Sequence, residues 1–245
     1  MKTRILYLLL ALSLVLPELK AKVNDSVDAV LKELDAVIQQ KDKYTLPKEA
    51  ELTVLRSRLK HAKDSRQKYE LCDKLFSSYL HYQADSALAY VEKKRELLPL
   101  LNEPLLEQEL IINSAEVMGV MGMYSWAEEL LSQVKPETLT PSLLGYYYRT
   151  VRANYGWFAD YLINKDLKEY YQTQAHIYRD SIMLTTTPGI DHDIVEAEKL
   201  MVEGEIDRSM EILNRLSENN PDLRQQAFIN YTLADIYGLQ GDVDS

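Results

Sequence analysis

Apolar residues recur at steps of three and four along most of the chain, the period of a helix with one buried face. The first such helix follows Asn24, and its apolar positions are Val27, Val30, Leu31, Leu34, Val37 and Ile38. Pro47 stands where a proline is tolerated at a helix start, and a second apolar series follows it at Leu52, Leu55 and Leu59. These patterns predict an N-terminal helical cap over residues 22–65.

The first residues have the pattern of a secretory signal peptide. Lys2 and Arg4 precede an apolar stretch over residues 5–16, and a short polar run ends at Ala21. The apolar stretch is shorter than the roughly 20 residues that a membrane-spanning helix needs. We therefore expect residues 1–21 to be removed on export, although a short uncleaved anchor is the alternative.

From Tyr69 onward the pattern indicates repeated pairs of helices. Anchor residues recur at steps of 40, 41, 41 and 37 residues, at Leu75, Ala115, Gly156, Ala197 and Ala234. Residues at a second column follow the first four anchors after 12 positions, at Ala87, Ala127, Lys168 and Ser209. Antiparallel helices approach closely where side chains are small. The spacing predicts an all-α, right-handed solenoid of helix pairs over residues 66–245, with the last repeat incomplete.

Two turn motifs sharpen this prediction. A glycine, an aromatic residue and a small residue occur in order in Gly122-Met-Tyr124-Ser-Trp126-Ala127, and a related order occurs in Gly204-Glu-Ile206 with Ser209. A third copy begins at Gly241-Asp-Val243, and Pro136 and Pro221 stand near the ends of units. These segments resemble the tetratricopeptide repeat (TPR). Because the spacing is nearer 40 residues than the usual 34 or so, a HEAT-type helical hairpin repeat stays open.

A larger block resembles one group of TPR proteins. It comprises Leu144-Gly-Tyr-Tyr-Tyr-Arg149, Tyr155-Gly156, Asp160-Tyr161 and Tyr178-Arg-Asp-Ser181. The group consists of exported Bacteroidetes-type TPR proteins that act as membrane-bound transcriptional regulators, with one membrane span followed by a cytoplasmic coiled coil and a DNA-binding region. The resemblance implies a periplasmic sensing or scaffolding domain, anchored in the inner membrane by a span beyond residue 245.

Two other functions are compatible with the repeats. The first is a free periplasmic or surface adaptor that assembles an envelope complex. The second is a carbohydrate-uptake surface lipoprotein, which would need a lipid-bearing cysteine near the cleavage site, where the sequence has none. The fifth repeat lacks its second helix, so we expect the chain to be the N-terminal portion of a longer protein.

Charge argues against nucleic-acid binding by this segment. The chain has a formal net charge of −10, and removal of residues 1–21 leaves 25 basic and 37 acidic residues, a net charge of −12. Such a surface repels phosphate backbones. Cys72 is the single cysteine, so it forms no intramolecular disulfide, and its apolar neighbours predict a buried, inert thiol.

No motif indicates catalysis, a metal or a cofactor. The sequence contains no glycine-rich phosphate loop, nucleophile elbow or paired-cysteine motif. His61, His81 and His176 lack partners at the spacing of metal ligands. The run from Asp191 to Asp193 encloses His192, but adjacent residues do not easily converge on one ion, so a helix cap with a solvated histidine is the preferred interpretation.

The expected site is the concave face of the solenoid, which the first helix of each pair lines. The residue after each small anchor should point into it, and residues four positions before and after should flank it. Those taken as the partner-binding groove are Ile112, Glu116, Val120, Trp157, Tyr161, Ile194, Glu198, Tyr231 and Asp235. The flanking rows also contain Ala153, Val202 and Leu239. The groove is acidic and apolar, which predicts a protein or peptide partner with basic and apolar side chains. The alternative is that the carboxylates are merely solvated.

Tyrosine is unusually frequent, with 17 residues against three phenylalanines. A tyrosine ring can line a wet groove or pack between helices. At helical spacing, packing between repeats is the preferred interpretation.

Overall fold

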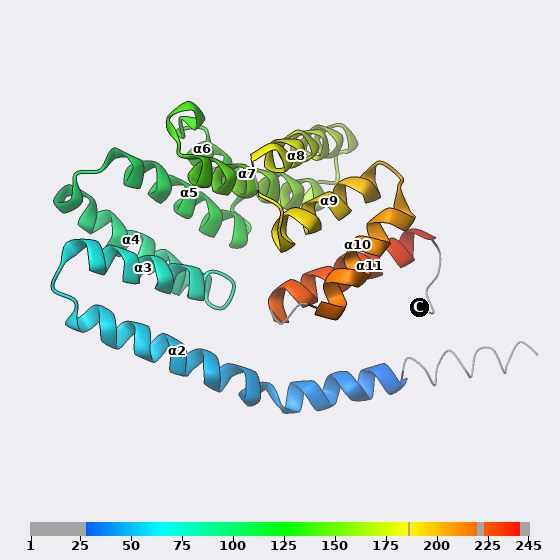
Figure 1. The fold of residues 1–245 in the computed structure, drawn as a ribbon, viewed down its shortest axis with the longest axis horizontal. Helices are drawn as coiled ribbons and strands as arrows, with labels where there is room; N and C mark the ends of the chain where they lie inside the picture. Colours follow the sequence, from blue (N-terminus) through cyan, green and yellow to red (C-terminus); the bar gives the residue numbers. More distant parts are fainter. Residues whose placement is uncertain (1–27, 186, 220–222, 241–245) are drawn as a thin grey trace, which may run out of the picture. The chain divides into compact units, whose positions relative to one another are not determined.

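The computed structural model describes residues 28–185, 187–219 and 223–240, and the regular structure in these residues is helical (Figure 1). The expected signal peptide and the motif that begins at Gly241 lie outside them. The elements are α2 (Lys41–His61), α3 (Ser65–Tyr79), α4 (Ala84–Leu101), α5 (Pro104–Val120), α6 (Tyr124–Leu131), η1 (Pro136–Thr138), α7 (Pro141–Tyr161), α8 (Lys165–Thr185), α9 (Ile190–Val202), α10 (Ile206–Asn219) and α11 (Leu223–Gln240). Within the described ranges, no helix is both long enough and apolar enough to cross a membrane.

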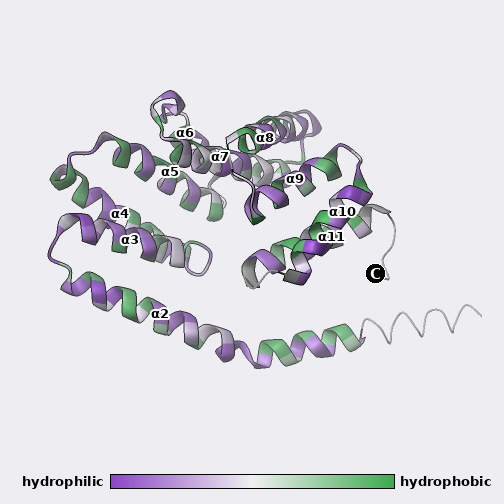
Figure 2. Ribbon diagram, viewed as in Figure 1, coloured by the Kyte–Doolittle hydropathy of each residue, from purple (hydrophilic) through white to green (hydrophobic). Residues whose placement is uncertain are grey.

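The chain divides into two compact units, one ending at Val54 and the other beginning at Leu55. In the first unit, residues 28–39 are helical and a turn at Gln40 separates them from α2. Pro47 lies inside α2, so the expectation that a helix begins there is wrong. A proline removes one backbone hydrogen bond, and the helix continues on both sides of it. Figure 2 shows hydrophobic residues along the first helical segment. Five large apolar side chains of this segment are exposed, at Val30, Leu31, Leu34, Val37 and Ile38. Its role as a cap stays a prediction.

The second unit consists of antiparallel helix pairs, as the repeat spacing predicts. The pairs are α3–α4, α5–α6, α7–α8 and α9–α10, and α11 follows as the first helix of a fifth repeat. Each pair packs on the next, through the contacts of α4 with α5, α5 with α7, α8 with α9, and α10 with α11. This stacking confirms the all-α solenoid of antiparallel helix pairs, and four complete pairs lie within the described residues.

Small residues close two of the pairs as expected. Ala115 of α5 and Ala127 of α6 are both fully buried in one hydrophobic core. In the pair α9–α10, Ala197 is fully buried and the Ser209 hydroxyl donates a hydrogen bond of 2.7 Å to its carbonyl oxygen. Of the other anchors, Leu75 is fully buried, whereas Gly156 is only half-buried and Ala234 is exposed on α11. The small-residue rule therefore holds where both columns have a small residue.

The turn glycines have the conformation that the motifs predict. Gly122 and Gly204 have φ values of 79° and 81°, in the left-handed region that favours glycine. The backbone N–H of Met123 donates to the Met118 carbonyl at 2.8 Å, and that of Glu205 donates to Leu200 at 2.9 Å. This bond across the glycine is the mark of a Schellman motif, which satisfies carbonyl groups at the end of a helix. Both glycines are thus required by the backbone at the turn between paired helices.

The tyrosines of α7 and α8 mainly pack against one another. The Tyr155 ring centroid lies 5.5 Å from that of Tyr171 and 5.8 Å from that of Tyr178. Phe158 and Tyr171 have centroids 4.6 Å apart. Aromatic pairs at such distances stabilise packing beyond the area that they bury. These ring pairs lie within one repeat, whereas the expected packing between repeats is seen at Tyr147, which is buried in the core that α7 shares with α5 and α6.

A buried ionic cluster joins three consecutive helices. Glu198 of α9 is 5% exposed and pairs with Arg152 of α7 and with Arg179 of α8. Arg179 Nη1 also lies 2.6 Å from the Nδ1 atom of His176, one turn earlier on α8. Because a buried charge is costly unless it is paired, Glu198 depends on its two arginines. Burial, followed by the charges of Arg179 and Arg152, lowers the pKa of His176 from its ordinary value of 6.5.

His176 makes stability depend on pH. Its pKa is lower in the folded than in the unfolded state, so the unfolded state binds more protons as the pH falls through 6.5. Lowering the pH therefore reduces the free energy of unfolding, and the reduction ends once the pH is below the pKa of His176 in both the folded and the unfolded state. We expect His176→Gln to lose less stability than the wild type between about pH 7.5 and 5.5 in urea unfolding. His61→Gln, outside the cluster, should behave as the wild type, and an unchanged pH dependence for His176→Gln would contradict the assignment.

Candidate functional site

A cavity of 1020 Å³ lies along the first helices of four consecutive repeats. Its walls come from α3, α5, α7 and α9, from the turn that follows α3, and from the residues immediately before α5 and α7. We call it the concave groove. All of its lining residues belong to the second compact unit. The arrangement is the one expected for the first helices of stacked pairs.

Two of the predicted site residues line the concave groove. Glu116 of α5 and Trp157 of α7 are both part of its wall, and Ala153 lies one turn before Trp157. The Trp157 side chain is 37% exposed, and its ring approaches the position that a Cβ atom on Gly119 would occupy to 3.2 Å. The absence of a side chain at Gly119 therefore lets the indole lie close against α5.

Two other predicted residues belong to hydrophobic cores. Ile112 is fully buried in the core between α5, α6 and α7, and Ile194 is buried in the core that α9 shares with α10 and α11. The residues that follow them, Asn113 and Val195, line the groove instead. The expectation that Ile112 and Ile194 face the groove is wrong, because their side chains fill the space between helices.

The remaining predicted residues lie apart from the groove wall. Val120 is half-buried, and Tyr161 is 79% exposed beside a different depression that Tyr124, Trp126 and Phe158 also line. Tyr231 and Asp235 are exposed on α11. Glu198 does not line the groove itself, but it forms an ion pair with Arg152, which does. The structure thus does not bring these five residues to one surface.

The wall also contains residues that the sequence pattern did not single out. Acidic side chains come from Asp73, Glu103, Glu109 and Asp191 in addition to Glu116, and basic ones come from Arg149 and Arg152 on α7. Apolar side chains come from Phe76, Leu80, Leu105, Leu106, Leu143 and Val195. Carboxylates outnumber guanidinium groups, as the expectation of an acidic and apolar groove requires, but the middle repeat contributes positive charge.

A buried lysine organises the acidic end of the groove. Lys94 of α4 is fully buried, and its Nζ atom donates to Asp73 Oδ1 at 2.5 Å and to Glu109 Oε1 at 2.6 Å. A third bond of 2.6 Å goes to Asn113 Oδ1, and the Tyr69 ring centroid lies 4.6 Å from Nζ. All three ammonium protons thus have an acceptor. Lys94 thus links α4 to α3 and α5, and its positive charge partly neutralises the carboxylates of Asp73 and Glu109.

The hydrogen-bond chain continues across the groove to the next repeat. Asn113 Nδ2 donates to the Tyr146 hydroxyl of α7 at 2.9 Å, and that hydroxyl in turn donates to Glu116 Oε2. Burial and the neighbouring Glu116 carboxylate raise the pKa of Tyr146 well above its ordinary value, so the phenol stays protonated. The Tyr146 hydroxyl therefore positions the Glu116 carboxylate on the groove wall.

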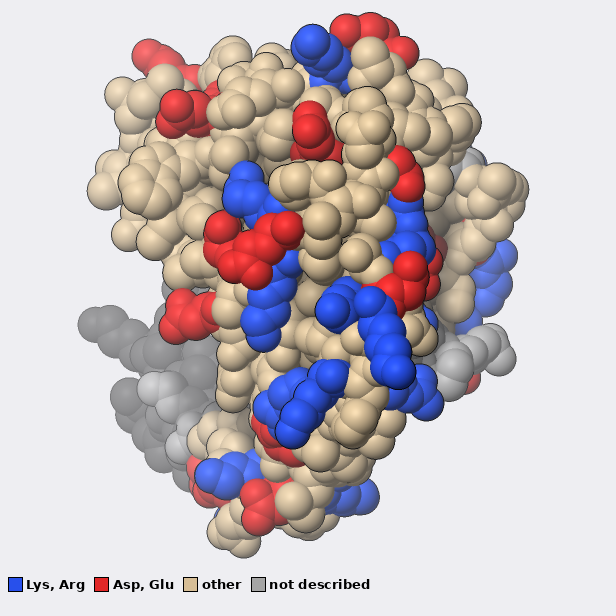
Figure 3. Space-filling view, turned by 90° about the vertical axis from the view of Figure 1, so that its left-hand side faces the viewer, with Lys and Arg blue, Asp and Glu red and all other residues tan. Residues whose placement is uncertain are grey.

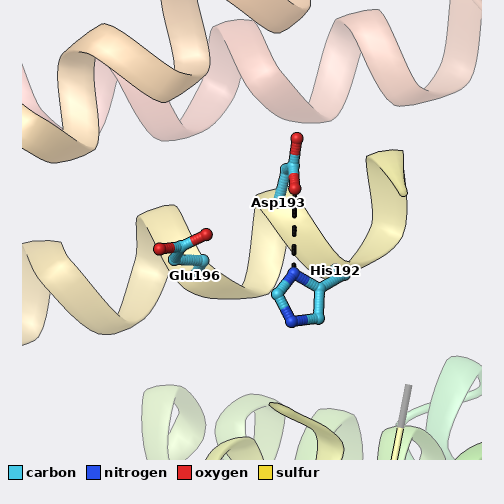
Figure 4. Close-up of side chains that lie close together, drawn as sticks. All are labelled: His192, Asp193 and Glu196. Atoms are coloured by element: carbon cyan, nitrogen blue, oxygen red, sulfur yellow. Dashed lines mark ion pairs between the residues drawn. The ribbon is translucent and has the colours of Figure 1, made fainter. Parts of the chain in front are cut away.

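The histidine that the sequence places between two aspartates has no clear metal geometry. Ligand atoms of His192, Asp193 and Glu196 lie within 4.8 Å of one another on one turn of α9 (Figure 4). The His192 ring and the Asp193 carboxylate face each other, with 3.7 Å between Nδ1 and Oδ1 (Figure 4), and Asp193 Oδ2 accepts a bond of 3.0 Å from Arg215 Nη2. Asp191 and Asp193 occupy the first turn of α9, where a negative charge complements the helix dipole.

Replacing Lys94 tests the organisation of the groove. We expect Lys94→Met to lower the free energy of unfolding by about 3 kcal/mol, because it leaves Asn113, Asp73 and Glu109 without their shared cation. The neighbouring Arg95→Met removes only an exposed pair with Glu92, so a change within about 0.5 kcal/mol is expected. Urea unfolding of both variants measures the difference. Equal, small effects would mean that the buried ammonium contributes little.

Comparison with known proteins agrees with the repeat architecture. The family described as the SusR N-terminal TPR domain matches residues 38–245, which is most of the chain and all of the concave groove. No curated protein and no solved structure gives a significant match. TPR domains generally mediate protein–protein interaction and are generally non-catalytic. With its helix pairs, turn glycines and matched length, the chain belongs to the SusR N-terminal TPR domain family.

Proposed function

We propose that this TPR domain is the periplasmic sensing or scaffolding part of a membrane-bound transcriptional regulator, and that it captures a protein or peptide in the concave groove. The observation that carries the proposal is the groove itself, in which Glu116 and Trp157 offer a carboxylate and an indole on adjacent helices. The signal would pass to the membrane through chain beyond residue 245. In this function the domain is a binding module without cofactors.

The groove's chemistry supports a partner with basic and apolar side chains. Tyr146 holds the Glu116 carboxylate in place, so a Lys or Arg side chain of the partner would meet a fixed acceptor. Trp157 offers a half-exposed aromatic face beside it, where cationic and apolar groups both bind well. Arg149 can bind carbonyl oxygen atoms of the same segment. An extended or helical peptide laid along α5 and α7 uses all of these groups.

Peptide binding distinguishes this groove from a solvated surface. Fluorescence anisotropy should show that a labelled 15-residue peptide of alternating basic and apolar residues binds about tenfold more tightly than one with acidic residues in place of the basic ones. Trp157→Ala and Glu116→Gln should each weaken binding of the basic peptide about tenfold, since each removes a central contact.

Two variants are matched controls for this experiment. Trp126→Ala removes a 62% exposed indole outside the groove, and Glu129→Gln removes an exposed carboxylate of α6. Both should bind the peptide as the wild type does. Equal binding of the acidic peptide, or equal losses in the controls, would contradict the groove as the binding surface.

Export is tested separately. If residues 1–21 are a signal peptide, expression of the chain in a Bacteroidetes host should yield a periplasmic protein that begins at Lys22. Intact-mass measurement of the purified protein and osmotic-shock fractionation check the two parts. A product that retains Met1 and stays with the cytosol would contradict the periplasmic location without affecting the groove.

A further inference from the structure

A second cavity, of 560 Å³, lies away from the concave groove among α2, α3 and α4. Four basic side chains surround it, Arg56 and Lys60 from α2, Lys68 from α3 and Lys93 from α4, with Glu96 as the carboxylate among its lining residues. We call it the basic pocket. It lies wholly within the second compact unit. The lining residues of the pocket thus have a positive net charge, whereas the chain as a whole has a net charge of −10.

Three of the four basic side chains of the pocket, the lysines, are not neutralised within the described part of the chain. Among the described residues, Lys60, Lys68 and Lys93 form no ion pair, and Lys93 Nζ lies over the Tyr90 ring at 4.5 Å from its centroid. Arg56 Nη1 donates to the Tyr79 hydroxyl at 3.0 Å. The adjacent Lys94, by contrast, has two carboxylates. The charges of the three lysines, gathered without carboxylate partners, repel one another, and an anion bound between them relieves the repulsion.

The inner wall of the pocket is apolar. Cys72 and Tyr90 are buried, at 1% and 7% exposure, and Leu59 and Leu97 are half-buried beside them. Burial raises the pKa of the Cys72 thiol, although Lys93 and Lys94 act in the opposite direction. The thiol thus stays neutral at neutral pH and adds no negative charge. A cavity of this size with an apolar wall and charged rim fits an organic molecule of modest size.

Lys and Arg side chains, with some acidic side chains among them, are frequent on one face of the molecule. Figure 3 views the molecule from the left-hand side of Figure 1, where the α2–α3 turn lies, and shows Lys and Arg side chains gathered over the centre and lower part of this face. Field lines from several like charges around a cavity converge in it and raise the local concentration of anions.

We propose that the basic pocket binds a small organic phosphate, with the phosphate between the Lys and Arg side chains and the organic group against Cys72, Tyr90 and the leucines. Several cations match a doubly charged phosphate better than a single carboxylate. This site is independent of the concave groove, which lies on other helix faces and has the opposite charge.

Isothermal titration calorimetry of residues 22–245 tests the proposal with 1-naphthyl phosphate as the probe. At low salt it should bind at least about tenfold more tightly than inorganic phosphate, which lacks the apolar group, and 1-naphthol should not bind detectably. The double variant Lys60→Gln/Lys93→Gln should weaken binding at least about tenfold. Lys135→Gln/Lys165→Gln, with the same change of net charge at exposed positions outside the pocket, should stay within about twofold.

A variant that is expected to bind more tightly distinguishes a change in the pocket from a loss of folded structure. Glu96→Gln removes the pocket's carboxylate and should tighten binding of 1-naphthyl phosphate about threefold, which no loss of structure would mimic. Three results would overturn the proposal. They are no measurable heat with the wild type, equal weakening by both double variants, and equal affinities for 1-naphthyl phosphate and inorganic phosphate, the last of which would indicate a site for free phosphate alone.

Discussion

The close approach of paired helices is the constraint on which the rest of the structure depends. Ala115 against Ala127, and Ala197 against Ser209, allow the two helices of a pair to pack without large side chains between them. Once the pairs are fixed, their first helices lie in a row and the groove follows from their stacking. The turn glycines serve the same end, because Gly122 and Gly204 reverse the chain within a few residues while satisfying the helix ends.

Much of the fold could be predicted from the sequence because its signals are local. The period of apolar residues, the recurrence of small anchors and the turn glycines each depend on residues close together in the chain. The prediction that a helix begins at Pro47 is wrong because the sequence around a proline inside a helix can look the same as that around a proline at a helix start. The anchors Gly156 and Ala234 fail as buried positions because α7 packs through its tyrosines and α11 has no second helix among the described residues.

The groove was harder to predict because it depends on rotation about each helix axis. Asn113 and Ile112, three and four residues before Glu116, lie on opposite sides of Glu116 around the helix axis. The apolar side chain of Ile112 is the feature of the sequence that indicates a place in the core. Ile194 and Val195 are both apolar, so residue type alone does not indicate which of them faces the groove and which belongs to the core. The buried Lys94 could not be foreseen, since a lysine in a helix is usually solvated and its acceptors Asp73 and Glu109 come from two other helices.

Arg152 gives the groove a built-in discrimination between charges. Its guanidinium lines the groove and at the same time neutralises Glu198, which is buried between repeats. An acidic ligand that drew Arg152 toward itself would leave Glu198 with Arg179 alone and would break the ion pair that links α7 to α9. A cationic ligand makes no such demand. The buried Glu198 therefore makes the groove less favourable for acidic than for basic ligands, because an acidic ligand that engages Arg152 competes with the ion pair between two repeats.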